Sequence, residues 1–100
     1  MPRQHFESAK TAQAIEVNHA LRVQLIIVEL ELATTFAKSA ESAVSNERAT
    51  RNLDHARRAY NAACHFLQTA TPEPETAEYI SANVVRLRAW LEELGQRLDQ

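Results

Sequence analysis

The chain has 100 residues, of which 45% are hydrophobic and 24% are charged, and its formal net charge is −2 at pH 7. This composition is typical of a folded protein with a modest core, and the small net charge favours neither a nucleic acid nor an anionic membrane as the partner. Cys64 is the only cysteine, so an intrachain disulfide and a cysteine-based zinc site are both excluded.

Membrane insertion and secretion also find no support in the sequence. The longest uninterrupted apolar run is Leu25 to Val28, far too short for a membrane span. The first ten residues, MPRQHFESAK, lack the apolar segment of a signal peptide. We therefore expect a cytoplasmic protein with no membrane partner.

Turn-forming residues are scarce. The chain has one glycine and three prolines, and Pro2, Pro72 and Pro74 all lie outside its periodic segments. Because hairpins and bulges need such residues, the sequence predicts an all-α fold that forms one helical domain over residues 1–100.

The first helix is predicted over about residues 9–43, with Ser8 or Thr11 as its N-cap. It contains the most apolar segment of the chain, LRVQLIIVELELATTFA at residues 21–37. At 1.5 Å per residue this helix would be about 50 Å long, which makes it the longest of the fold.

At about 100° per residue, this helix is apolar on two opposite sides. One side, here called the first stripe, consists of Val17, Leu21, Leu25, Val28, Leu32 and Phe36. The other side, the second stripe, consists of Ile15, Val23, Ile26, Ile27, Leu30, Ala33 and Ala37. Polar residues separate the two stripes: Asn18, Arg22 and Glu29 along one boundary, and Gln13, Gln24, Glu31 and Lys38 along the other.

A helix that is apolar on two sides must be covered on two sides. We predict that the first stripe faces the core of the chain. The second stripe is then predicted to be the interface with another chain, and His19 is included with it as a polar residue that contacts the partner.

A second helix is predicted over residues 46–70. Ser45 or Asn46 can cap its start, and Glu47 suits the positive end of its dipole. Since residues 39–46 hold no glycine or proline, a single bent helix remains an alternative. The predicted buried face is Ala49, Leu53, Ala56, Ala59, Tyr60, Ala63, Cys64, Leu67 and Ala70, with Phe66 at its margin. Glu47 with Arg51 and Asp54 with Arg58 are expected ion pairs on the outer face.

The segment TPEPE at residues 71–75 interrupts the helical pattern, and Pro74 suits the first position of a third helix, predicted over residues 74–95. Its apolar row is Ile80, Val84, Leu87, Leu91, Leu94 and Leu98, with Trp90 beside it. Gly95 either ends this helix or is tolerated within it. The sequence thus predicts an antiparallel three-helix bundle with a long first helix, dimerised into a larger bundle.

Candidate chemistry is sparse. Glu16 and His19 form an E-x-x-H pair of the kind that carboxylate-bridged metal bundles use, but the inner faces of the other helices offer no further glutamate. His55 and His65 do not share a face and are expected in solvent, and Cys64 is expected as a small core residue. We predict no catalytic, cofactor-binding or metal-binding residue, and no enzymatic activity.

The most basic segment is the second helix, which carries Arg48, Arg51, Arg57, Arg58 and His55. Acidic Glu47 and Asp54 are interleaved with these residues, and no row of aromatic residues accompanies them for stacking on bases. We therefore expect no nucleic-acid partner.

One pattern resembles known interaction modules. The run LDHARRAYNAACHFL places Ala56, Tyr60, Ala63 and Phe66 at the spacing A-x3-Y-x2-A-x2-F, and this resembles the second helix of microtubule-interacting-and-transport domains and of tetratricopeptide hairpins. The following EYISANVVRLRAWLEEL is similar to the third helix of the former, so that the likeness covers about residues 53–94. It implies a small helical bundle that holds partner helices in grooves.

These observations lead to a functional prediction. The chain is expected to be a non-catalytic assembly or adaptor domain that forms a homodimer through the second stripe. The alternative is a monomeric binding module that presents this stripe as a groove for a partner's amphipathic helix. A metal-binding bundle built on Glu16 and His19 is a more remote alternative, and a third helix that covers both stripes would leave no interface.

Overall fold

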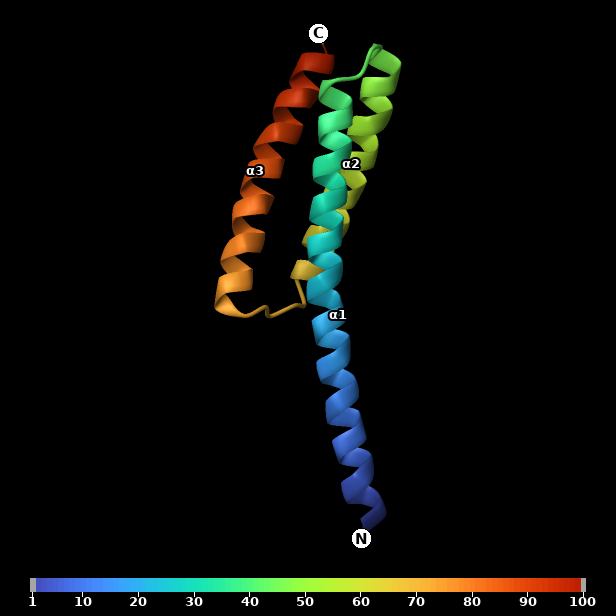
Figure 1. Cartoon of the computed structure of the whole chain (residues 1–100), viewed down its shortest axis with the longest axis vertical. Coiled ribbons are helices and arrows are strands. Elements are labelled where there is room, and N and C mark those ends of the chain that lie inside the picture. Colours follow the sequence, from blue (N-terminus) through green and yellow to red (C-terminus); the bar gives the residue numbers. More distant parts are fainter. Residues whose placement is uncertain (1, 100) are drawn as a thin grey trace.

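The computed structural model describes the backbone of residues 2–99 and the side chains of residues 17–99. The described chain contains three helices, α1 (Pro2–Glu41), α2 (Asn46–Leu67) and α3 (Pro74–Leu98), and no strand. The predicted all-α helical bundle is confirmed. Helix α1 has 40 residues against 22 and 25 for the others, and Figure 1 shows its N-terminal part running past the ends of α2 and α3.

The helix boundaries differ from the predicted ones mainly at the ends. Helix α1 begins at Pro2 instead of near residue 9, because proline is well suited to the first turn of a helix. Helix α2 ends at Leu67, three residues before the predicted end. Helix α3 continues through Gly95 to Leu98, so the glycine is tolerated within the helix. A side chain at Gly95 would meet the guanidinium group of Arg57, which packs across this position.

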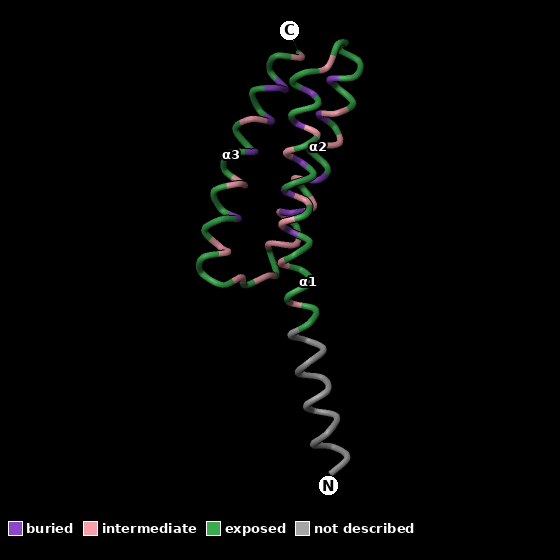
Figure 2. Tube along the Cα trace, viewed as in Figure 1, coloured by how far each residue is buried: buried purple, intermediate pink, exposed green. Residues whose placement is uncertain are grey.

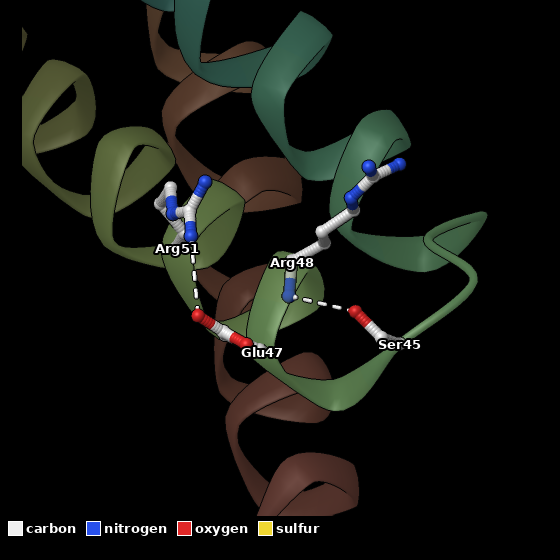
Figure 3. Close-up of polar contacts among 4 residues, drawn as sticks. All are labelled: Ser45, Glu47, Arg48 and Arg51. Atoms are coloured by element: carbon white, nitrogen blue, oxygen red, sulfur yellow. Dashed lines mark hydrogen bonds and ion pairs between the residues drawn. The ribbon is translucent and has the colours of Figure 1, made fainter.

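Residues 42–45 separate α1 from α2, which excludes a single bent helix. Ser45 has an extended backbone (φ −137°, ψ 154°), and its hydroxyl accepts a hydrogen bond from the backbone N–H of Arg48 at 3.2 Å. Figure 3 shows this cap together with the predicted ion pair between Glu47 and Arg51, whose charged atoms are 3.4 Å apart. The ion pairs between described side chains do not include Asp54 with Arg58.

Helices α1 and α2 pack through small side chains. The start of α2 lies beside the end of α1 (Figure 1), and there Ala37 and Ala40 share a core cluster with Ala56. Further along, Ala33 lies in a second cluster with Ala59 and Ala63. Because alanine occupies little space, the backbones of α1 and α2 can approach closely along this line.

Helix α3 completes the core with the apolar row predicted for it. Ile80 and Leu87 join the cluster around Ile26, and Leu91 and Leu94 join the one around Ala37. Figure 2 shows that the buried positions of α3 lie toward the other two helices. Within residues 17–99 every fully buried residue is apolar or glycine, so the core holds no ionisable group.

The structure reverses the roles predicted for the two stripes of α1. In the second stripe, Ile26, Leu30, Ala33 and Ala37 are at most 3% exposed and belong to the core of this chain. They are therefore not a surface that a second chain could contact, and the predicted interface is wrong at these residues. Val23 and Ile27 are half-buried against the same core, and the side chain of Ile15 lies outside the described residues.

The reversal has a physical reason in the alanines of α2. A helix whose inner face is Ala49, Ala56, Ala59 and Ala63 packs best against another face of small residues. In α1 only the second stripe offers such a row, since Ala33 and Ala37 continue to Ala40, while the first stripe is made of larger side chains. The sequence-based prediction did not take this complementarity into account.

Candidate interaction surface

The first stripe is the largest set of exposed apolar side chains along one element. Five of its six members are 42–58% exposed, at successive spacings of four, four, three and four residues: Val17, Leu21, Leu25, Val28 and Leu32. The sixth, Phe36, is half-buried and stacks on the ring of His55, with 4.9 Å between ring centroids. The prediction that this stripe faces the core is therefore wrong for the five exposed residues.

The first stripe is bordered by the other two helices of the bundle. On one side, Phe36 contacts α2, and Arg22 donates a hydrogen bond to the hydroxyl of Thr69, just after α2, at 3.0 Å. On the other side, Glu31 and Thr35 line a pocket of about 270 Å³ together with residues of α3, among them the half-exposed Tyr79. The stripe is thus an apolar ridge on α1, flanked by α2 and α3.

Charged residues line both edges of this ridge. Arg22 and Glu29 lie on the edge toward α2, and Glu31 and Lys38 lie on the edge toward α3. The three ion pairs between described side chains are all within α2 or α3, so none of them involves these four residues. The charges that border the ridge are consequently not neutralised by an ion pair within residues 17–99.

His19 lies at the end of the bundle and has a partner within the chain. Its Nε2 is 3.1 Å from both the carbonyl oxygen and the hydroxyl of Thr71, and 3.3 Å from the backbone nitrogen of the same residue. These contacts attach α1 to the connection between α2 and α3. His19 and Thr71 also line a cleft of about 460 Å³, together with Val23 and Pro72. The contact of His19 with another chain stays a prediction, but its ring is already engaged by Thr71.

The described residues add no further ligands to the proposed metal site at Glu16 and His19. Within residues 17–99, no group of three or more His, Cys, Asp or Glu side chains lies close enough to hold a metal ion. The side chain of Glu16, the proposed partner of His19, lies outside the described residues.

Another pocket, of about 400 Å³, lies between α2 and α3. Its lining is Arg57, Tyr60, Asn61, Arg88, Leu91 and Glu92. The pKa of Tyr60 is raised above its usual value, first by burial and then by a hydrogen bond and an electrostatic interaction with Cys64. Cys64 itself is half-buried and belongs to neither core cluster, so it is not the core residue that was predicted. Arg88 is paired with Glu92 at 3.4 Å, so one of the two arginines here is already neutralised.

Two other sequence predictions concern individual residues. His65 is exposed as predicted, whereas His55 is half-buried because of its stacking on Phe36.

In the part of the chain that the structure describes, no helix combines the length and the apolar character needed to cross a bilayer.

Comparison of the chain with models of known protein families, with curated protein sequences and with solved structures finds no match. The resemblance of residues 53–94 to microtubule-interacting and tetratricopeptide modules therefore stays a resemblance of sequence pattern. The exposed ridge on α1 remains as the observation from which a function can be argued.

Proposed function

We propose that this chain is a non-catalytic assembly domain, an antiparallel three-helix bundle that pairs with a second copy of itself through the first stripe. The observation that supports this is the row of five apolar side chains that are about half exposed on one side of α1. Single exposed apolar residues are common on protein surfaces, but a contiguous row of them marks a contact surface.

The free energy available is of the size that a reversible dimer needs. Burying a Val or Leu side chain completely stabilises by about 1.5–3 kcal/mol, so burying the remaining half gives roughly 1 kcal/mol. Five such side chains from each copy would contribute on the order of 10 kcal/mol, against an association cost of about 4–15 kcal/mol. At the low end of that cost the net gain is about 6 kcal/mol, which corresponds to a dimer that forms at some tens of micromolar.

A second candidate is a binding module that holds an amphipathic helix of another protein on the same ridge. The pocket of about 270 Å³ between α1 and α3 favours this candidate, since it could receive a side chain from a helix lying on the ridge. In that case the isolated chain would remain monomeric at concentrations at which a homodimer forms.

Sedimentation equilibrium over about 1–100 µM tests the proposal. The wild-type chain should pass from monomer to dimer in this range. Val28→Glu places a charge at the centre of the ridge and should remain monomeric with unchanged helix content in circular dichroism. The matched control is Val85→Glu, because Val85 is 67% exposed on the outer side of α3, and this variant should dimerise like the wild type.

A wild-type chain that stays monomeric up to about 100 µM would reject self-association and favour the binding module. Equal loss of dimer in Val85→Glu and Val28→Glu would show that the contact is not located on the ridge.

A further inference from the structure

We propose that the two α1 helices of this dimer pack antiparallel, with the twofold axis between Ile26 and Ile27, so that Arg22 of each copy pairs with Glu29 of the other. This inference rests on the proposed self-association and specifies its geometry. It follows from the order of the exposed apolar residues and from the charges at the edges of the ridge.

The apolar residues define the register. From Leu21 to Leu32 the ridge has the spacing four, three, four, which is the repeat with which two helices interlock side chains. In an antiparallel pair Leu25 would face Val28 of the second copy, and Leu21 would face Leu32. Both contacts occur twice by symmetry, and together they place the axis midway between residues 26 and 27. Asn18 and Thr35, both exposed, would face each other at the two ends of this contact.

The charges at the edges favour this orientation over the parallel one. In the antiparallel register Arg22 lies across from Glu29 of the second copy, and symmetry provides the same opposite-charge pair a second time. On the other edge Gln24 lies across from Glu31, which is a neutral residue against a charge. On this edge Val17 also lies across from Lys38, so the complementary charges of the antiparallel pair are those of Arg22 and Glu29.

A parallel pair in register would bring different residues together. Gln24 would then lie across from Glu29, Glu31 across from Phe36, and Val17 across from Arg22. No pair of opposite charges forms, and two of the three contacts place a charge against an apolar side chain. Electrostatic complementarity therefore selects the antiparallel arrangement.

The contacts within the chain leave Arg22 able to make this pair. Its guanidinium group donates one hydrogen bond to the hydroxyl of Thr69 at 3.0 Å and has further N–H donors that can reach a carboxylate. The hydrogen bond holds the guanidinium group at the edge of the ridge that faces Thr69.

Exchange of the two charges tests the pairing. Arg22→Glu and Glu29→Arg each create two like-charge contacts in the antiparallel dimer and should weaken it by roughly 3- to 30-fold in sedimentation. The double variant R22E/E29R restores both pairs and should dimerise within about twofold of the wild type. An equimolar mixture of the two single variants should form a heterodimer of similar strength. Arg51→Glu, an exposed charge reversal on α2, is the matched control and should have no effect.

Additive weakening in the double variant would overturn the proposed pairing. It would leave the dimer itself intact as long as the wild type sediments as a dimer, so the two proposals fail separately.

Cross-linking determines the orientation independently of charge. In a Cys64→Ala background, Asn18→Cys and Thr35→Cys are oxidised with glutathione disulfide, singly and mixed. In the antiparallel dimer the equivalent cysteines of two identical variant chains lie about 25 Å apart along the helix, too far for a disulfide. Only the mixture of the two variants should therefore yield cross-linked dimer. Cross-linking of Asn18→Cys alone would show a parallel dimer, and a dimer that cross-links in no combination would reject the register.

Discussion

The pKa of Tyr60 is raised above its usual value in the folded chain. It lies between α2 and α3 beside Cys64, and burial is the main reason why its pKa is raised. Burial removes water from the phenolate form, and the hydrogen bond and the electrostatic interaction with Cys64 act in the same direction. The folded chain therefore favours the neutral hydroxyl of Tyr60 over its phenolate.

This shift predicts a loss of stability at alkaline pH. The unfolded chain loses the Tyr60 proton near pH 10, while the folded chain still holds it, so the unfolded state binds fewer protons and the free energy of unfolding falls as pH rises. The contribution is complete below about pH 10 and is lost as pH rises through the folded pKa. Urea denaturation from neutral to alkaline pH should show a steeper loss in the wild type than in Tyr60→Phe. Equal slopes for the two proteins would contradict the prediction.

The two stripes of α1 differ in burial, as two adjacent residues show. Ile26 is completely buried, and Leu25 next to it is 43% exposed. Ile26→Ala should lower the free energy of unfolding by about 2–5 kcal/mol because it leaves a cavity in the core, whereas Leu25→Ala should cost less than about 1 kcal/mol. The measurement is urea denaturation at a concentration below the dimer range. A larger effect at Leu25 would mean that the first stripe faces the core after all.

At the level of elements, the hydroxyl of Ser45 caps the start of α2, directly after the short connection from α1. Ser45 satisfies the backbone N–H of Arg48, which would otherwise have no partner in the first turn of α2. Ser45→Ala should reduce the stability of the bundle by about 1 kcal/mol, and Ser45→Asp should retain it, because aspartate caps helices equally well. Thermal unfolding of the three proteins measures this. An alanine variant as stable as the wild type would show that the cap contributes nothing to the start of α2.

The elements themselves could be predicted from sequence, because local signals determine them. Serine at the start of α2, proline at the start of α3 and the apolar period of each segment all act within a few residues. Helices α2 and α3 each have one dominant apolar side, and their buried faces agree with the prediction. In α1 the hydrophobicities nearly cancel around the axis, so the sequence of this helix alone does not select an inner side.

What selects the inner side of α1 is a property of its neighbour. The alanines of α2 fit a row of small residues, and only Ala33, Ala37 and Ala40 provide one. A comparison of side-chain volumes between the two helices could have found this match, whereas a count of apolar residues could not. The predicted interface was consequently placed on the side of α1 that faces the core, while the exposed apolar residues lie on the opposite side.

For the whole molecule, self-association predicts a dependence of thermal stability on concentration. A dimer that forms only from folded chains stabilises the folded state by mass action. The midpoint of thermal unfolding should therefore rise by a few degrees between about 5 and 100 µM for the wild type. Val28→Glu should show no such rise, and Val85→Glu should behave like the wild type. A wild-type midpoint that does not change with concentration would contradict the dimer.

The alanine contact between α1 and α2 also limits which substitutions the chain can tolerate there during evolution. Where two methyl groups meet, the distance between the helices is fixed by the main chains, and there is no larger side chain that could shrink to make room. Size, more than polarity, therefore limits variation along this line: serine can replace alanine in such places, while valine or leucine would force the helices apart. In the proposed dimer the exposed ridge would have the opposite restriction, because larger apolar side chains fit there and charged side chains do not.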